Sequence, residues 1–588
     1  MNLQPVSGVR VDLDAPARMR DGVTLRANIY RPDDGGASAH PVLLTRMPYG
    51  KDLPIGASVL DPVQAARRGY IVVVQDVRGA FASEGDWYPL LHEAADGVDT
   101  VAWAAQIPGS NGSVGMYGAS YFGQTQWAAA SAGAPALRAM APMITWADGE
   151  EAALRDGVLE WGTQVSWLLQ QGLAQMFRRY PSDPQALGKA VYSVTQAYDS
   201  LVSGNYERLP LDQYPALLAL DLNAPLADTI RARDTGDYNG LPHGPQNYDR
   251  IALPMMHISG WYDVFLKGTL KNYTEMRKRG APGQSLIIGP WTHGRVDPLI
   301  GDIYFGMASS GALMDYQIDL MSLHLQFFDR WLKGQQPSPF DRQPPVKYFL
   351  MGANIWKTAG SWPPEGFAEQ RWYLHSGGRA NTASGDGALS PFAPQAEPAD
   401  GYTYDPANPT PTIGGATLLH SFYRAGPIDQ TPIERRADTL VYTSSALERP
   451  LEVTGPVTVT LHVASDAPDT DFVARLVDVY PDGRAIPLTD GVTRMRYRNG
   501  LETPASPMEP GAAYIITVDL WATANTFLPG HRIRLDVTSS SFPRWERNLN
   551  TGQSNATTTA MRPARQTVLH DAGHPSYVSL PVALGSPA

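Results

Sequence analysis

The chain has 588 residues, 43% of them hydrophobic and 18% charged, and its formal net charge is −11. This composition is typical of a folded protein of about three to four domains and excludes a disordered or fibrous chain. The acidic balance argues against nucleic acid as a partner, because phosphate binding needs clustered Lys and Arg. The sequence has no cysteine, which excludes disulfides, thiolate nucleophiles and Cys-ligated metals.

The N-terminal segment lacks the basic start and apolar core of a signal peptide. No apolar run in the sequence approaches the roughly 18–20 residues that cross a membrane. We therefore expect a cytoplasmic protein with no membrane partner.

The first part of the chain alternates strand and helix patterns. Residues 23–32 alternate apolar and polar side chains as a strand does. Residues 41–45 and 70–76 are the continuous apolar runs of strands that are buried on both faces, and 113–118 is a further short strand. Helical patterns lie between these strands. The alternation predicts a mostly parallel, doubly wound α/β sheet, with residues 1–146 as its first part.

The next segment, residues 147–247, is helical in pattern and contains no convincing strand. Strands return within residues 248–350, at 253–260 and 284–290, with a helical pattern between them. The simplest interpretation is a helical cap inserted into one α/β domain.

Short β-rich segments separated by turns fill residues 351–588. Many short strands at this spacing predict an all-β sandwich of jelly-roll type.

A candidate nucleophile follows the strand at 113–118. Ser120 lies in the sequence Gly-Ala-Ser-Tyr-Phe-Gly, which departs from the usual G-x-S-x-G elbow because Gly123 comes one position late. A glycine on the first helical turn could still allow close packing, and the Tyr121 N–H would face the substrate oxygen. An ordinary structural turn is the alternative at this point.

Two later strand ends supply partners for such a serine. The strand at 253–260 runs into Asp263, and the strand at 284–290 runs into His293. Ligands of open α/β sheets bind at the C-terminal edge of the strands, so these side chains and Ser120 should meet there. Their chain order, Ser then Asp then His, is the one that hydrolases with a nucleophile elbow use.

The other histidines do not indicate a metal. His257 lies inside a strand, where a hydrogen-bonded structural role is expected. No HExxH pattern exists, so we expect neither a catalytic metal nor a cofactor. The histidines without ligand spacing are His243, His324, His375, His420 and His531.

A second donor for the oxyanion could come from Tyr49, which follows the strand at 41–45. Its phenol would then face the same sheet edge as Ser120. A tyrosine that merely packs against Pro48 in a turn is the competing interpretation.

At these residues the sequence resembles the cocaine esterase family, within the wider group of X-Pro dipeptidyl-peptidase-like serine hydrolases. In that family the elbow reads G-x-S-Y-x-G, so Tyr121 and Gly123 fit its pattern. The likeness covers nearly the whole chain and thins in the helical insertion. The matching stretches include LLTRMPYGK, VVVQDVRGAFASEGDW, SNGSVGMYGASYFGQTQW, ISGWYDVF, IIGPWTHG and TFLPGHRIRLDVTSSSFPRWERNLNTG.

The resemblance implies an α/β-hydrolase domain, an inserted helical cap and a C-terminal jelly roll, with the active site where the three meet. It implies Ser120, Asp263 and His293 as the catalytic triad. It also implies an oxyanion hole made of the Tyr49 hydroxyl and the Tyr121 backbone N–H. Dimers occur among these relatives, so a homodimer is left open.

The residues after Asp263 bear on the substrate. Relatives that hydrolyse α-amino acid esters hold the substrate ammonium with carboxylates, some of which closely follow the catalytic aspartate. Here those positions are Val264, Phe265 and Leu266, which suit an aromatic or aliphatic acyl group. The resemblance places the phenylalanine, Phe265, in the acyl pocket.

The cap contributes weaker candidates for substrate binding. Trp161 and Trp167 lie at helical spacing, which is also typical of core residues. Asp148, Glu150 and Glu151 could supply an acidic cluster, although a solvated helix start is the default interpretation.

The leading hypothesis is a serine carboxylesterase that hydrolyses small apolar or aryl esters through an acyl-enzyme. An α-amino acid ester hydrolase, acylase or X-Pro dipeptidyl-peptidase-like enzyme is the second hypothesis. A non-catalytic carbohydrate-binding protein built on the jelly roll is the third.

Overall fold

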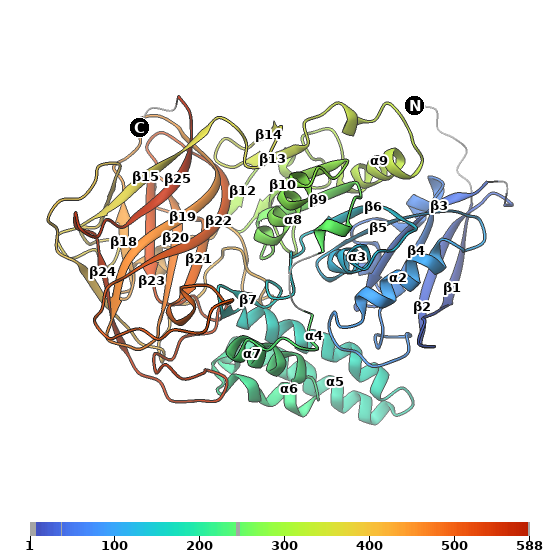
Figure 1. The fold of residues 1–588 in the computed structure, drawn as a ribbon, viewed down its shortest axis with the longest axis horizontal. Helices are drawn as coiled ribbons and strands as arrows, with labels where there is room; N and C mark the ends of the chain where they lie inside the picture. The colour runs from blue at the N-terminus through green and yellow to red at the C-terminus, as the bar shows by residue number, and fades with distance from the viewer. Residues whose placement is uncertain (1–7, 37, 243–246, 586–588) are drawn as a thin grey trace.

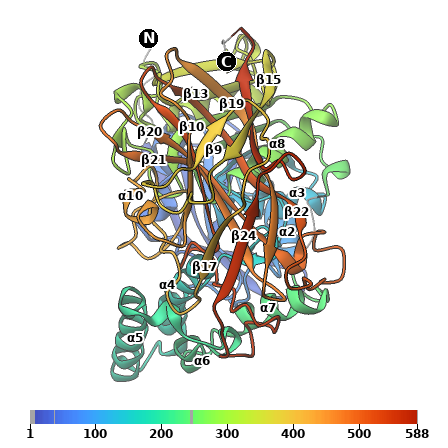
Figure 2. The same ribbon diagram turned by 90° about the vertical axis from the view of Figure 1, so that its left-hand side faces the viewer.

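The computed structural model describes residues 8–36, 38–242 and 247–585. Three parts are visible in Figure 1: an α/β domain, a helical cap below it, and a β-sandwich beside both. Figure 2, turned by 90°, shows the cap helices at one end of the molecule.

Within the described residues, ten strands form the sheet of the α/β domain, in the order β1-β2-β4-β3-β5-β6-β9-β10-β13-β14. The strands from β4 to β13 in this order run parallel, and β1, β2 and β14 pair antiparallel at the edges. The bounds are β1 Gly8–Arg18, β2 Thr24–Asp33, β3 His40–Met47, β4 Ile71–Asp76, β5 Ser110–Ala119, β6 Leu137–Met143, β9 Met255–Tyr262, β10 Gln284–Thr292, β13 Val346–Leu350 and β14 Ile355–Ala359.

Helices cover both faces of this sheet. Within β3, Leu44 packs in a core with α2, α3 and α8, whereas its neighbour Leu43 packs in a core with α1 and α9. Successive side chains of a strand point to opposite faces, so a continuous apolar run needs a helical layer on each side. The bounds are α1 Pro62–Arg67, α2 Glu93–Ala104, α3 Tyr121–Ser131, α8 Leu266–Lys278 and α9 Leu320–Leu332.

The cap differs from the sequence-based expectation at its start. Instead of helix, the chain forms a hairpin of two-residue strands, β7 Leu154–Arg155 and β8 Val158–Leu159. Its turn is Asp156-Gly157, with φ of 47° and 82°, the conformation that Asp-Gly favours in tight hairpins. The expectation of no strand in this segment was therefore wrong. The cap helices are α4 Trp161–Arg179, α5 Pro184–Asp199, α6 Pro215–Ala219 and α7 Ala224–Thr235.

The C-terminal part, as far as the structure describes it, is a mostly antiparallel β-sandwich whose strands connect into one 11-stranded sheet. β14 lies past the expected boundary at residue 350, yet it pairs with β13, so the α/β sheet continues to Ala359. The sandwich elements are β15 Phe367–His375, β16 Ala388–Ser390, β17 Asp400–Tyr404, α10 Thr431–Glu434, β18 Leu440–Thr443, β19 Leu451–Ser465, β20 Asp471–Val479, β21 Ala485–Arg494, β22 Tyr514–Phe527, β23 Arg532–Thr538, β24 Ala564–Leu569 and β25 Tyr577–Ala583.

Among the described residues, no helix is both long and apolar enough to cross a membrane.

Candidate active site

Ser120 lies in the sharp turn between β5 and α3, with φ 56° and ψ −124°. Positive φ is unfavourable for a residue with a side chain, so the surrounding structure must hold it. The Ser120 N–H donates to the Met143 carbonyl at 2.9 Å, and the Thr145 hydroxyl donates to the Ser120 carbonyl at 2.9 Å. This strained strand-to-helix turn is the geometry of a nucleophile elbow.

The two glycines around Ser120 allow this turn. A Cβ on Gly118, whose φ is 143°, would lie 2.2 Å from the Phe122 ring. A Cβ on Gly123 would lie 2.8 Å from the Thr145 Cβ and 3.1 Å from the Met143 carbonyl oxygen. The late glycine therefore lets α3 pack closely against the segment after β6, which confirms its expected packing role.

Three strand ends bring Ser120, His293 and Asp263 into one hydrogen-bonded series. The His293 Nε2 lies 3.0 Å from the Ser120 Oγ, and its Nδ1 lies 2.8 Å from the Asp263 Oδ1. The Asp263 side chain is fully buried, so water does not compete for its contact with the imidazole. Nδ1 therefore donates to the carboxylate, and Nε2 is left free to accept the serine proton.

Asp263 is itself fixed by its own loop. Its Oδ2 accepts a hydrogen bond from the Ser259 hydroxyl at 2.8 Å. Its Oδ1 also accepts from the Phe265 N–H at 3.2 Å. These bonds leave the carboxylate little freedom to turn away from His293.

Tyr49 lies beside Ser120, and its phenolic oxygen accepts a hydrogen bond from the Trp167 Nε1 at 3.1 Å. Burial raises the pKa of Tyr49 to about 12, although its hydrogen bonds with Trp167 and Ser120 act in the opposite direction. The phenol therefore keeps its proton at neutral pH and can donate it to a bound oxygen.

Tyr121 begins α3, where a backbone N–H has no partner within the helix. Its phenol is held away from the pocket centre, donating to the Glu93 carboxylate at 2.8 Å and accepting from the Leu90 N–H at 2.9 Å. Glu93 in turn forms a buried ion pair with Arg46 at 2.8 Å. Because the phenol is occupied, the backbone N–H stays the group of Tyr121 that we predict to contact an oxyanion.

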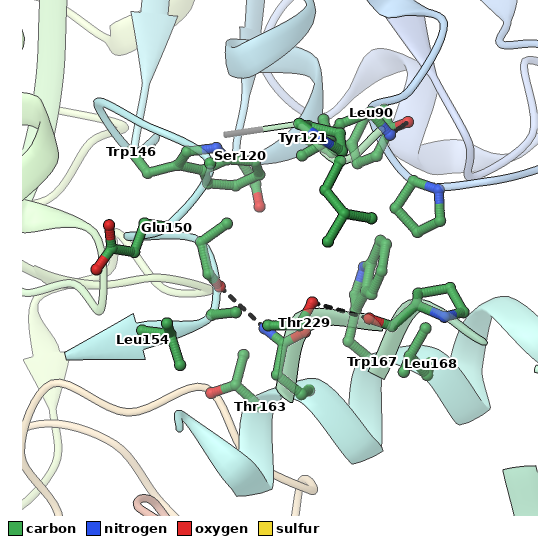
Figure 3. A pocket seen from close by; sticks show the side chains of 18 of the residues that line it. Leu90, Ser120, Tyr121, Trp146, Glu150, Leu154, Thr163, Trp167, Leu168 and Thr229 are labelled. Carbon is green, nitrogen blue, oxygen red and sulfur yellow. Dashed lines mark hydrogen bonds between the residues drawn. The ribbon is translucent and has the colours of Figure 1, made fainter. Parts of the chain in front are cut away.

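A pocket opens at Ser120 between the sheet edge and the cap (Figure 3). The serine hydroxyl points into it, and Thr163, Trp167 and Leu168 of α4 form the opposite wall. The described lining is mostly aromatic or apolar: Tyr49, Tyr88, Pro89, Leu90, Ser120, Tyr121, Trp146, Gly149, Glu150, Ala152, Ala153, Leu154, Thr163, Gln164, Trp167, Leu168, Pro225, Thr229, Tyr238, Leu241, Pro242, Phe265 and Leu418.

Phe265 forms the pocket wall nearest the imidazole. Its ring centroid lies 5.3 Å from that of His293, edge to face, and 4.7 Å from that of Trp146. The sequence singled out Phe265 but missed Trp146. The available signal was the position of Trp146 just after β6, a further strand end at the same edge of the sheet.

The two cap tryptophans have different surroundings. Trp167 lines the pocket and stacks on the Tyr121 ring with centroids 6.2 Å apart. Trp161 is fully buried in the cap core, where its Nε1 donates to the Tyr206 carbonyl at 2.8 Å. It does not belong to the described pocket lining, so the expectation that Trp161 contacts substrate was wrong. Its side chain points to the cap core because it lies on a face of α4 that is turned away from Ser120.

The three acidic residues at the start of the cap are not a solvated helix start. Asp148 pairs with Lys271 at 2.8 Å, and Glu151 accepts from the Ala147 N–H. Glu150 is the one acidic side chain in the described lining, and its carboxylate points away from Ser120 (Figure 3). Burial, together with neighbouring carboxylates, raises the pKa of Glu150 to about 7.

The described residues contain no group of three or more His, Cys, Asp or Glu side chains placed to hold a metal. His257 is buried in β9 and hydrogen-bonded to Gln284 at 2.9 Å, as expected for a structural histidine. Burial lowers the pKa of His257 to about 4. His243 lies outside the described residues.

Comparison with known proteins shows the family to which the chain belongs. Residues 21–295 match the family model of the X-Pro dipeptidyl-peptidases (S15 family), and residues 338–579 match the X-Pro dipeptidyl-peptidase C-terminal non-catalytic domain. The chain is 37% identical to cocaine esterase of Rhodococcus sp. (strain MB1 Bresler) over 570 residues, or 96% of this chain and 97% of that one.

Two solved structures share the whole architecture. An α-amino acid ester hydrolase matches with a TM-score of 0.78 at 24% identity, and the match covers 99% of this chain and 98% of that one. An aminopeptidase from a Thaumarchaeota archaeon has a TM-score of 0.73 at 25% identity, with coverages of 98% and 96%.

The fold and the Ser–His–Asp series define a serine hydrolase with an α/β-hydrolase domain. The chain belongs to the family that includes cocaine esterase and the X-Pro dipeptidyl-peptidases. The predicted family, fold class and enzyme class are thereby confirmed, and a non-catalytic binding protein is excluded.

Proposed function

We propose that this chain is a carboxylesterase for esters with small apolar or aryl acyl groups. The observation that carries the proposal is the Ser120–His293–Asp263 series facing a pocket with aromatic walls. An apolar pocket favours an acyl group that loses little hydration on binding.

In the first half-reaction the Ser120 Oγ attacks the ester carbonyl carbon while the His293 Nε2 takes its proton. The negative charge on the carbonyl oxygen is stabilised by the Tyr49 hydroxyl and the Tyr121 N–H. The C–O bond to the alcohol then breaks, and His293 returns the proton to the leaving oxygen.

In the second half-reaction water attacks the acyl-enzyme carbonyl and gives its proton to His293. The bond to Ser120 breaks, the serine recovers the proton, and the carboxylic acid leaves. Throughout, Asp263 holds the Nδ1–H of His293 and stabilises the imidazolium.

A panel of p-nitrophenyl esters with varied acyl length and aromaticity tests this function. Wild-type protein should favour benzoyl, propionyl or butyryl esters over long-chain esters, because Phe265 and Trp146 bound the acyl space. Phe265→Ala should widen the range of accepted acyl groups. Absence of hydrolysis across the panel, or unchanged hydrolysis by Ser120→Ala, would refute the proposal.

Esters that carry an amino group form the second candidate substrate class. Glu150 in the pocket lining favours it, since a carboxylate can pair with an ammonium. Against the α-amino version, the residues directly after Asp263 are apolar and Glu150 points away from Ser120. Comparing an aryl butyrate with an α-aminobutyrate of the same alcohol separates the two classes.

Cytoplasmic location and a homodimer both stay predictions. Light scattering of the purified protein would test the homodimer directly.

A further inference from the structure

Arg155, in the cap hairpin, lies where the three parts of the molecule meet. Its side chain is 6% exposed. The Arg155 Nη1 donates to the carbonyl of the preceding residue, Leu154, at 2.7 Å. Leu154 lines the pocket. A buried guanidinium needs several partners, because removing it from water is costly.

One partner of Arg155 is the loop that carries the catalytic carboxylate. The Arg155 Nη2 donates to the Val264 carbonyl at 2.6 Å, between Asp263 and Phe265. The guanidinium carbon also lies 5.8 Å from the Phe265 ring centroid. A single side chain thus contacts the backbone that connects the triad to the acyl wall.

The other partners tie Arg155 to the β-sandwich. The guanidinium lies 5.3 Å from the Trp521 ring centroid of β22. Its Nε forms an ion pair with the Glu160 Oε1 at 3.3 Å, and that oxygen accepts a hydrogen bond from the Trp545 Nε1 at 3.0 Å. Both tryptophans belong to the sandwich, so its packing helps to hold the guanidinium in place.

The sandwich also contacts the same loop on each flank. Before Asp263, the Tyr262 hydroxyl donates to the Pro487 carbonyl at 3.0 Å. After it, the Lys267 Nζ pairs with Asp519 at 2.9 Å. Arg155 completes these contacts at the centre of the loop, between the two flanks.

We propose that Arg155 is a positioning residue through which the β-sandwich sets the geometry of the Asp263–Phe265 loop. This inference rests on the proposed function of Ser120, His293 and Asp263. The sandwich part would then act on catalysis through the Asp263–Phe265 loop, in addition to lining the pocket with Leu418. Small displacements of a catalytic group are costly, since about 1 Å can lower a rate roughly 100-fold.

The test compares Arg155→Met with Arg547→Met. Arg547 is a matched control: it is a buried arginine that joins sandwich to cap, donating to the Glu207 carbonyl at 2.7 Å and lying over the Phe542 ring. The contacts of its side chain in the described part of the chain are with Pro406, Glu207 and Phe542, not with the Asp263 loop. Both variants lose packing and charge, so both should unfold at lower temperature than the wild type.

Only Arg155→Met should lose reactivity below its unfolding temperature. We expect kcat and the rate of fluorophosphonate labelling at Ser120 to fall about 10-fold or more, with KM for an acetyl ester nearly unchanged. Arg155→Lys, which keeps one charged donor, should recover part of the rate. In Trp521→Leu, kcat and the labelling rate should fall about threefold, because the guanidinium loses its cation–π contact.

The outcomes are distinguishable. Labelling of folded Arg155→Met at the wild-type rate, or an equal loss in Arg547→Met, would overturn the positioning role. If Arg155→Met does not fold, unaltered labelling of Trp521→Leu and Arg155→Lys would overturn it instead. Absence of labelling in the wild type would refute the proposed function itself.

Discussion

The indole Nε1 of Trp167 donates a hydrogen bond to the phenolic oxygen of Tyr49 at 3.1 Å. A residue of the cap therefore orients a residue of the sheet edge. Because the indole occupies an acceptor site of the phenol, the Tyr49 proton is left for another partner, and the substrate oxygen is the one that the mechanism requires.

Tyr49→Phe should lower kcat by about 10²–10³-fold, as expected for loss of one oxyanion donor. Trp167→Phe keeps an aromatic wall but removes the indole donor, so we expect a smaller fall of about three- to tenfold. Steady-state kinetics on one aryl ester measure both. Equal kcat in Tyr49→Phe and the wild type would remove Tyr49 from the oxyanion hole.

Trp161→Phe should behave in the opposite way to Trp167→Phe. Trp161 lies in the cap core and donates to the Tyr206 carbonyl, so its replacement leaves a cavity and an unpaired carbonyl. We expect a loss of about 1–3 kcal/mol in the free energy of unfolding, with KM and kcat near wild type at 25 °C. A thermal melt measures the first and ester kinetics the second. A change in KM without loss of stability would show instead that Trp161 contacts the substrate.

Glu150 should make substrate preference depend on pH around 7. Burial and nearby carboxylates raise its pKa to about 7, so it is neutral below that pH and anionic above it. KM for a neutral aryl ester should rise as the pH passes 7, and KM for an ester with an ammonium group on its acyl chain should fall. Glu150→Gln should flatten both profiles, and an unaltered profile in that variant would contradict this assignment.

The same group affects stability with a defined sign. A carboxyl whose pKa rises on folding stabilises the folded state in its neutral form. That contribution is complete below the ordinary value of 4.5 and is lost as the pH rises through about 7. Glu150→Gln should therefore raise Tm above pH 7 relative to the wild type and change it little below pH 4.5. Melts across this range test the sign.

Gly123 and Gly188 provide a matched pair of helical glycines. A Cβ at Gly123 would overlap Thr145 and the Met143 carbonyl, whereas one at Gly188 in α5 meets nothing within 4 Å. Gly123→Ala should lower Tm and reduce kcat by displacing Ser120. Gly188→Ala should stabilise the protein by about 0.5–1 kcal/mol, because alanine loses less entropy in a helix. Melting curves and ester kinetics of both variants test this prediction. Equal Tm changes would show that the position of Gly123 tolerates a Cβ.

The sequence was sufficient for the α/β domain and for the meeting of Ser120, Asp263 and His293 at one sheet edge. Apolar runs fully buried between two helical layers are visible in sequence, and each of these side chains follows such a run. The chain order Ser120, Asp263, His293 then limited the alternatives, since parallel strands expose their C-terminal ends at one edge. The displaced Gly123 was explained by the family pattern and by packing against Thr145.

The cap was less predictable. Its tryptophans Trp161 and Trp167 lie on the same helix, and the sequence alone could not say which face of α4 would meet the pocket. The Asp156-Gly157 hairpin was hidden within a helical pattern, because two-residue strands are too short to show a period. Contacts with residues far away in sequence decided both the orientation of α4 and the formation of the hairpin.

What the sequence by itself determined is therefore the residue set: Ser120, Asp263 and His293 at one edge of a parallel sheet. What only the tertiary structure decided is the environment of that residue set. Glu150 enters the pocket lining, Trp167 orients Tyr49, and Arg155 joins the sandwich to the Asp263 loop. These contacts depend on how three separately patterned segments pack, and no local period in the sequence encodes such packing.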